Sequence, residues 1–576
     1  MILKLLFKVI LIGSIIFSHN ILLASCDCGS IDHANPCTGK NIFVTVDATS
    51  INGKMSHDAN FKWDFNSNGQ EAYCGQFANG DYWVAPRNGK AIQFTSITGN
   101  GPISVDLNPQ MESTGILSEA NDYGNYNKSE NIMDFLPVSA TGPASVVAAI
   151  QRDETISGKC GTAAIEGRCI DAYHVLTVLP DIPKNAGRDM IRPNITGKKK
   201  ELLFLDDFDL SRLPRKDFLS GATEEMYETI RQRWTHNTEI FGFYSINNKT
   251  YYSEGGRAFR AHILVDDYGS GMAAQWYADM MCMFSSDSIR KKRKALAAML
   301  AYGLDLYHGM YDSPPEILRA WGAGAGQHQG RFIPAVFMAA LAKNPEFSGV
   351  LKTASSKIYS IKDTGPAELS QVQKGKRIPV WGDIMMGDAE IKAYWADLFE
   401  SQCYDGAKGK CNPQNGSKTG RDPYGYIDGP APLPGTSYMR ISAGTQRALV
   451  ASMLIMPEIG EIVNFRPLID YVFRLDESGI TSNNDPCAAP DSRESLNCRP
   501  WNNGVDCRFY GITWGPDNKL PTDCIKNDIG RFSSQHGKPL QYAYTIPEVE
   551  KNWRIIRQLH NHKTLEKTSK SLPAYH

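Results

Sequence analysis

The spacing of hydrophobic residues differs between the first and the second part of the chain. Before about residue 190, short apolar runs alternate with polar residues at every second position, and glycine, asparagine and proline interrupt the intervals. Such alternation is typical of strands with one buried face. Asn79 and Gly80 precede one run and predict a tight type I′ turn. The sequence predicts a β-rich domain over residues 26–190, a sandwich or a similar fold, with its clearest runs at 42–46, 81–84, 92–97 and 144–150.

After about residue 223 the period becomes helical. Apolar residues recur at three- and four-residue steps in 272–284 and in 296–307, whereas 332–342 is apolar on nearly every side, which predicts a buried helix. Consecutive helices joined by loops predict stacked hairpins, as in an α/α toroid or a solenoid, and no strict repeat selects the solenoid. Further helical patterns cover 389–399, 444–456, 465–474 and 549–559.

The predicted fold class is therefore multidomain, with separate α and β parts. A connector at 191–222 follows the β-rich domain, and an all-α, α/α-toroid-like domain of helical hairpins follows at 223–576. Within that domain, 402–440 and 476–546 are rich in glycine, proline and cysteine and read as long, disulfide-pinned loops. The acidic run 206–209 lacks the glycine and the final glutamate of a calcium loop, so we interpret it as capping a turn.

The first 25 residues have the pattern of an export signal peptide. Lys4 and Lys8 lie near the start, an apolar run follows, and the segment ends with Leu-Ala-Ser-Cys at 23–26. This ending resembles a bacterial lipobox, whose cysteine becomes the lipidated first residue. In the alternative, cleavage is ordinary and Cys26 or Cys28 joins a disulfide. The first interpretation predicts a periplasmic or cell-surface lipoprotein anchored to the membrane, since nothing after residue 26 is apolar enough to span one.

Thirteen cysteines agree with an oxidising compartment. Cys282 lies in an apolar helical run and is expected to be a free, buried thiol. A zinc site is disfavoured, because the chain has no Cys-x-x-Cys pair and no His-Glu-x-x-His motif. Pairing between sequence neighbours is one arrangement that the spacing allows. Such pairs are Cys28/Cys37, Cys160/Cys169, Cys403/Cys411, Cys487/Cys498 and Cys507/Cys524.

Overall charge and short motifs exclude several function classes. A net charge of −1 gives no whole-chain basis for binding nucleic acid. The basic run 290–294 lies in a helical pattern and is interpreted as a solvated face. The glycines of the chain match neither the P-loop nor the dinucleotide fingerprint, and the stretches around Ser270 and Ser437 are not nucleophile elbows. We expect no cofactor and no metal.

A glycine-rich stretch at 321–331 separates two helical patterns: Trp-Gly-Ala-Gly-Ala-Gly-Gln-His-Gln-Gly-Arg. Its glycines allow the backbone to approach a ligand closely. Gln327, His328, Gln329 and Arg331 supply two carboxamides, an imidazole and a guanidinium. The stretch is therefore interpreted as the wall of a ligand site, and the alternative is a flexible connector.

Several stretches resemble a family of secreted bacterial proteins. They include Gly-Gln-Phe-Ala-Asn-Gly-Asp-Tyr-Trp-Val at 75–84 and Tyr-Gly-Leu-Asp-Leu-Tyr at 302–307. The helical part of that family is similar to the α/α toroids of alginate lyases and heparinase-type polysaccharide lyases. The resemblance covers most of the chain after the signal and implies an exported, polysaccharide-degrading enzyme. The other stretches that carry it are 192–193, 206–211, 326–331, 510–517, 530–532 and 536–537.

β-Elimination on a uronic-acid polysaccharide needs three actions at one site. The C6 carboxylate must be neutralised, the C5 proton must be removed, and the departing O4 must be protonated. We expect His328 to shuttle the proton, with Tyr268 as the alternative base. Arg331 and Gln327 would meet the carboxylate, since arginine can bind it with two hydrogen bonds. The remaining substrate-binding candidates are His236, Asn237, Gln329, Trp276, Trp321, Tyr438 and Arg440.

Each candidate also has a purely structural interpretation. His328 would pin a loop, Arg331 would bond carbonyls at a helix start, and a helical tryptophan such as Trp276 would be a core residue. Two rival functions also stay open. A glycoside hydrolase needs two carboxylates across a cleft, and no pair stands out in this sequence. A non-catalytic, glycan-binding surface lipoprotein would keep the aromatic residues but tolerate the loss of His328 and Tyr268.

The lipobox generates the first prediction. Cys26→Ala should release the exported protein from the membrane fraction into the soluble fraction, because the acyl-bearing cysteine is lost. Membrane fractionation followed by immunoblotting measures this, with Cys282→Ala as the control that should stay membrane-bound. Unchanged fractionation of Cys26→Ala would remove the anchor.

Overall fold

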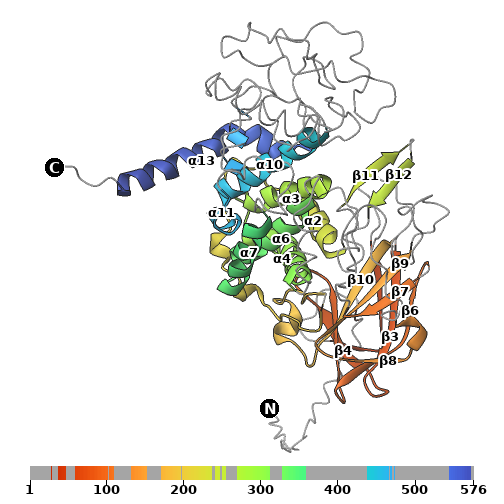
Figure 1. Cartoon of the computed structure of the whole chain (residues 1–576). Helices are drawn as coiled ribbons and strands as arrows, with labels where there is room; N and C mark the ends of the chain where they lie inside the picture. The colour runs from red at the N-terminus through yellow and green to blue at the C-terminus, as the bar shows by residue number, and fades with distance from the viewer. Residues whose placement is uncertain are drawn as a thin grey trace, which may run out of the picture.

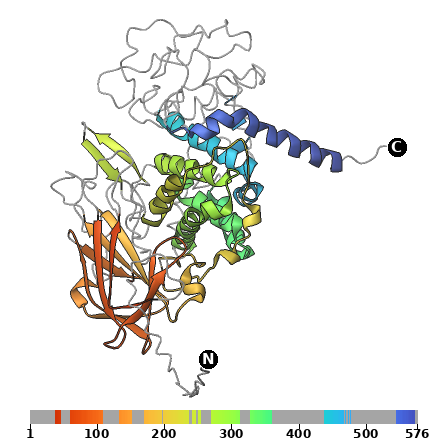
Figure 2. The same cartoon turned by 180° about the vertical axis from the view of Figure 1, so that it is seen from behind.

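The computed structural model describes a β part, a helical part and the segment between them. The described residues are 28, 37–46, 59–101, 103–108, 132–151, 170–195, 197–236, 241–246, 249–253, 269–311, 327–358, 437–465, 468–469, 472–473, 476 and 544–571. Figures 1 and 2 show the sheets at one side and the helices beside them, with the last helix projecting away from both.

Ten strands build two sheets that share a core. The six-stranded sheet has the order β1-β4-β5-β10-β9-β7, and the four-stranded sheet has the order β2-β3-β6-β8. Neighbouring strands are antiparallel except β5 and β10, which are parallel. The strands are β1 Cys37–Gly39, β2 Asn41–Val46, β3 Ala59–Asn66, β4 Ala72–Gln76, β5 Tyr82–Ala85, β6 Ala91–Gly99, β7 Ile103–Leu107, β8 Val138–Thr141, β9 Ala144–Gln151 and β10 Ile170–Val178.

The alternation in the sequence becomes the two faces of the four-stranded sheet. In β2 every second residue is buried, while Phe43 and its polar neighbours face outward. Trp63 and Phe94 from β3 and β6 meet residues of the other sheet in one apolar cluster. The prediction of a β-rich part is confirmed. The second sheet buries the apolar residues that occupy every second position of these strands. A strand lies at each of the four predicted runs, although β5 begins one residue later than predicted, at Tyr82.

The turn before β5 is wider than the sequence predicted. The loop between β4 and β5 spans residues 77–81 and closes with a hydrogen bond from the Phe77 N–H to the Asp81 carbonyl, 2.8 Å. Gly80 has a φ of +97°, as its position in the turn requires. A two-residue type I′ turn would have made Asp81 the first residue of β5. Asp81 instead stays in the loop, where its side chain accepts a hydrogen bond from Arg192.

The helical part packs on the outer face of the six-stranded sheet. Tyr173 and Val175 of β10 belong to the same apolar cluster as Trp234, Trp276 and the helices that follow. The helices are α2 Glu224–His236, α3 Gly269–Phe284, α4 Ile289–Tyr311, α6 Gln327–Leu341, α7 Pro345–Ile358, α10 Ser437–Ile455, α11 Pro457–Val463 and α13 Pro547–Ser571. The chain is thus of mixed class, with strands first and helices later.

Two features of the helical part differ from the prediction. A hairpin of β11 Phe241–Ile246 and β12 Lys249–Ser253 interrupts it. Aromatic residues flank Asn-Asn there, which is a hairpin signal that the helical period obscured. Helix α6 begins at Gln327, so 327–331 is its first turn rather than a loop. Glycine costs only about 1 kcal/mol in a helix, less than the burial of the apolar residues after it contributes.

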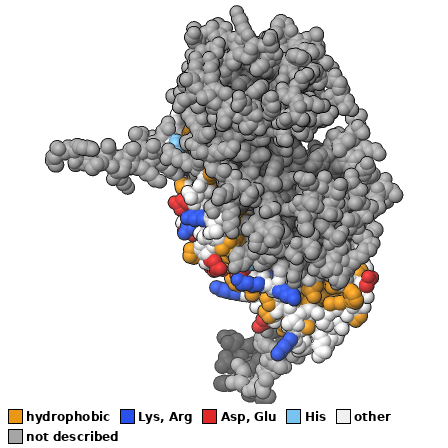
Figure 3. All heavy atoms as spheres, in the orientation of Figure 1, with side chains coloured by type: hydrophobic (Ala, Val, Ile, Leu, Met, Phe, Trp, Pro, Cys, Tyr) orange, Lys and Arg blue, Asp and Glu red, His pale blue; other side chains and the backbone are white. Residues whose placement is uncertain are grey.

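The connector and the basic run have specific contacts. The Phe204 N–H donates to Asp207 Oδ2 at 2.7 Å, and the Ser211 N–H donates to Asp209 Oδ1 at 3.2 Å. These bonds confirm that the acidic run caps turns. Positive and negative side chains are interspersed on the described surface (Figure 3). Lys292, however, is buried and donates to the Met283 and Ser285 carbonyls, so the run at 290–294 is not a wholly solvated face.

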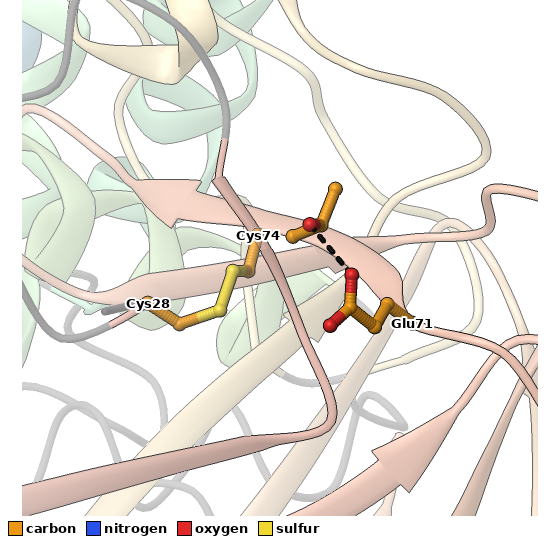
Figure 4. Close-up of a disulfide and its surroundings, with 4 residues drawn as sticks. Cys28, Glu71 and Cys74 are labelled. Carbon is orange, nitrogen blue, oxygen red and sulfur yellow. Dashed lines mark hydrogen bonds between the residues drawn. A yellow bond between two sulfur atoms is a disulfide. The ribbon is translucent and has the colours of Figure 1, made fainter. Parts of the chain in front are cut away.

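One disulfide joins Cys28 to Cys74 across 46 residues (Figure 4). Cys37 is also disulfide-bonded, so the pairing of Cys28 with Cys37 was wrong. Strand β1 pairs with β4 with Cys37 opposite Cys74, and Cys28, from the segment before β1, also reaches Cys74. Cys282 is free, as predicted, and burial raises the pKa of its thiol to about 11. The other four expected pairs lie outside the described residues. Among the described residues, no helix combines the length and hydrophobicity that a bilayer crossing requires.

The disulfide generates the second prediction. Cys28→Ala with Cys74→Ala should lower the free energy of unfolding of the β part by about 2–4 kcal/mol, because the unfolded chain regains the entropy of a long loop. Denaturant unfolding measures this difference. Cys282→Ala, which breaks no bridge, should unfold at nearly the same denaturant concentration as the parent. Equal stability of the double variant and the parent would contradict the bridge.

Candidate functional site

Three stretches that are distant in the sequence meet in one buried ion cluster between the sheet and the helices. Arg192 lies between Asp81 of the 77–81 loop and Asp305 of α4. Its Nε donates to Asp81 Oδ2 at 2.6 Å, its Nη1 donates to Asp305 Oδ1 at 3.0 Å, and its Nη2 pairs with Asp305 Oδ2. The pairs join residues 111 and 113 positions apart in the chain.

The ion cluster is closed to solvent and carries two carboxylates for one guanidinium. All three side chains are 1% exposed. Asp305 is well satisfied, because its Oδ1 also accepts from the Ile195 N–H at 2.8 Å. Burial raises the pKa of Asp81 to about 6, against the opposing charge of Arg192. Burial alone lowers the pKa of Arg192, but Asp305 and Asp81 outweigh it and raise that pKa. A substrate cannot reach these enclosed side chains. The cluster instead holds the 77–81 loop, the segment at Arg192 and α4 in fixed positions.

The loop that carries Asp81 also holds the end of α2. The Asn79 carbonyl accepts from Arg231 Nη1 at 2.9 Å and from Thr235 Oγ1 at 3.0 Å. Tyr173 of β10 donates its hydroxyl to the Thr235 carbonyl at 3.1 Å. A Cβ on Gly80 would lie 2.3 Å from Arg231 Nη1, the end of a long side chain that could shift, whereas the φ of +97° at this position favours glycine in any case. The last turn of α2 is therefore attached to the sheet.

A second buried cluster attaches the same turn to α3. Asp279 accepts from Arg233 Nη1 at 2.6 Å, from Trp234 Nε1 at 2.8 Å and from Gln275 Nε2 at 3.2 Å. Burial raises the pKa of Asp279, and Arg233 opposes the shift. Tyr227 meets the Cys282 carbonyl at the other end of the pair, so α2 and α3 are antiparallel.

Several predicted site residues belong to the ends of helices or directly adjoin them in the sequence. His236 is the last residue of α2, directly after the anchored Thr235, and Asn237 follows it in the sequence. Tyr268 directly precedes Gly269, the first residue of α3. The last turn of α2 contacts α3 at Asp279, ten residues after Gly269, and Asn237 and Tyr268 lie outside the described residues.

The glycine-rich segment contributes the start of α6. Gln327, His328, Gln329 and Arg331 all lie in its first two turns. Pro334 has no N–H, so the carbonyl four residues before it receives no helical hydrogen bond from that position. Tyr438 and Arg440 lie in the first turn of α10. The side chains of these residues and of His236 are outside the described part of the structure, as are Tyr268, Asn237, Trp321 and Cys26 altogether.

Trp276 lies in the core. It is fully buried, and its ring centroid is 4.6 Å from Trp234, 5.9 Å from Tyr302 and 5.9 Å from Phe337. A sugar ring cannot stack on a side chain that is enclosed in this way. The structure corrects its assignment as a substrate-binding candidate and favours the core interpretation.

The sequence contains a signal for the ion cluster. Asp81 directly precedes an apolar run and Asp305 lies inside one, and a charge in or beside such a run must be paired when the run is buried. His174, by contrast, is a buried structural histidine. Its Nδ1 accepts from Trp63 Nε1 at 3.1 Å, and burial lowers its pKa to about 3. Within the described residues, no group of three or more His, Cys, Asp or Glu side chains could hold a metal ion.

Asp81 generates the third prediction. The folded state holds the Asp81 proton more tightly than the unfolded chain does. The stability that this protonation contributes is fully present below the unfolded pKa of 3.8 and is lost as the pH rises through about 6. Asp81→Asn cannot ionise, so its thermal midpoint should fall less than that of the parent between about pH 4 and pH 7. Asp64→Asn, in an exposed pair with Lys62, should behave like the parent. Parallel curves for parent and Asp81→Asn would contradict the assignment.

Comparisons with known proteins assign no family to the chain. No family model, curated protein or solved structure matches it. The resemblance to toroid lyases therefore rests on the quoted stretches, and the function is argued from the residues themselves.

Proposed function

We propose that the chain is an exported polysaccharide lyase that cleaves uronic-acid glycans by β-elimination, with residues 223–576 arranged as an α/α toroid. The observation that carries the proposal is the double attachment of the last turn of α2. The 77–81 loop and Asp279 hold this turn from two sides, so the backbone at His236 is fixed. Rigid support of this kind is what a site needs to hold a sugar and a base in register.

The reaction assigns a role to each candidate. Arg331 and Gln327 bind the C6 carboxylate, which makes the C5 proton more acidic. His328 removes that proton, the C4–O4 bond breaks, a C4–C5 double bond forms, and a proton is returned to O4. Tyr268 is the alternative base, and Asn237 is a second group for the carboxylate.

The other candidates bind sugar units beside the cleaved bond. His236 stands at the fixed end of α2, while Gln329 belongs to the same turn as His328. Tyr438 and Arg440 come from α10, which shares the apolar cluster of the other helices. Trp321 supplies the stacking surface that the buried Trp276 cannot supply.

The proposed location is the periplasm or the cell surface, with Cys26 lipidated. The Cys28–Cys74 disulfide supports export, because disulfides persist in oxidising compartments. Cys28 is two residues after Cys26, so an anchor at Cys26 would hold the β part close to the membrane.

The elimination generates the fourth prediction. With polyuronates such as alginate, polygalacturonate or heparin, the parent should form an unsaturated uronate product, measured by its ultraviolet absorbance. His328→Ala should lower kcat about 100-fold or more, as expected for loss of a proton-transfer group. His560→Ala, on α13, is the matched control and should keep full activity.

Other outcomes select the rival functions. New reducing ends without the unsaturated product would replace the lyase with a glycoside hydrolase. Binding without any new ends would replace it with a glycan-binding lipoprotein. Full activity of His328→Ala together with loss of activity in Tyr268→Phe would move the base to Tyr268.

A further inference from the structure

Within the described part of the chain, no helix packs on the outer face of the four-stranded sheet. Its inner face packs against the six-stranded sheet, and it is the six-stranded sheet that carries the helices on its other side. The outer face of the β2-β3-β6-β8 sheet, named here the open face, therefore points away from the helical part (Figures 1 and 2). It consists of the outward residues of those strands.

The open face is electrically neutral. Its four strands contain two charged residues, Lys62 and Asp64, and these pair with each other at 3.0 Å. Nearly all other outward positions are Asn, Gln, Ser or Thr. A solvated face usually mixes many charges of both signs. The open face instead offers groups that both donate and accept hydrogen bonds.

The polar groups of the open face hold one another in place. Thr45 Oγ1 donates to Asn60 Oδ1 at 2.9 Å, across the β2–β3 pair. Asn66 Nδ2 donates to Gln93 Oε1 at 3.1 Å, across the β3–β6 pair. Thr95 Oγ1 donates to the Asp64 carbonyl at 3.2 Å. Side chains that are already ordered lose less entropy when a ligand binds them.

One exposed aromatic side chain lies among the polar residues of the open face. Phe43 on β2 is 59% exposed and lies opposite Lys62 of β3, which lies opposite Thr98 of β6. The four strands span about 14 Å, given the usual spacing between strands. An apolar ring beside ordered amides and hydroxyls matches a ligand that has apolar C–H faces and uncharged hydroxyls around its rim.

We propose that the open face binds an uncharged glycan chain, with Phe43 stacked on a sugar ring and the amides of Asn60, Asn66 and Gln93 bonded to sugar hydroxyls. The neutral charge disfavours polyuronates, nucleic acids and anionic lipids, all of which are attracted by net positive charge. A protein partner would need a larger apolar centre than one phenyl ring. The inference goes beyond the proposed cleavage, because it needs neither His328 nor a uronate.

The test is affinity electrophoresis of the full chain in native gels that contain hydroxyethylcellulose, galactomannan or soluble starch. At least one of these neutral polymers should retard the parent. Phe43→Ala should weaken that retardation about tenfold, and Phe43→Trp should retain it. Phe135→Ala is the matched control, because Phe135 is 62% exposed but lies on the 3-10 helix Met133–Phe135, outside the open face.

Three outcomes would overturn the proposal: no retardation of the parent by any neutral polymer, retardation by polygalacturonate alone, or equal losses in Phe43→Ala and Phe135→Ala. The failure of the cleavage proposal is separate from these. Phe43→Ala should keep the parent's rate on soluble polyuronate, and His328→Ala should keep the parent's retardation by the neutral polymer.

Discussion

The ion cluster of Arg192 with Asp81 and Asp305 is the constraint on which the rest of the structure depends. Buried charges are costly unless they are paired, and removing one partner from such a cluster costs about 3–5 kcal/mol. The 77–81 loop, the start of the connector and α4 must therefore assemble together. This requirement fixes how the helical part is seated on the six-stranded sheet.

The seating of the helices in turn sets the frame of the candidate site. Asn79, beside Asp81, receives hydrogen bonds from two residues of α2, and Asp279 of α3 receives two more from the same helix. The end of α2 is thus fixed by contacts to both a sheet and a helix. The proposed elimination would depend on such fixed geometry, since small displacements of a catalytic group lower rates strongly. The residues that hold the frame are buried, whereas His328 and Arg331, which are proposed to react, lie in the first two turns of α6.

The β part has two faces with different surroundings. Strand β5 is buried along its whole length, because Tyr82 and Val84 face the core between the sheets while Trp83 and Ala85 pack against the segment that follows β10. Strand β2 alternates, because only one of its faces is covered. The open face carries Phe43 and ordered amides instead of the many charges expected on a solvated sheet. The outer face of the six-stranded sheet supports the helices. The open face is available to bind a neutral polymer.

The sequence by itself determined that strands come first and helices later, the position of four strands and of several helices, the free thiol at Cys282 and the turn caps of the connector. These are local properties, since period, propensity and capping act within a few residues. Only the tertiary structure decided the partner of Cys28, the burial of Trp276 and the meeting of Asp81, Arg192 and Asp305. Of the candidate site, the sequence predicted helix-flanking segments, whereas the fold decided that the last turn of α2 is held by the 77–81 loop and by Asp279 of α3. Such pairings join residues that are distant in the chain, and strand register and helix packing select them, neither of which a local pattern contains.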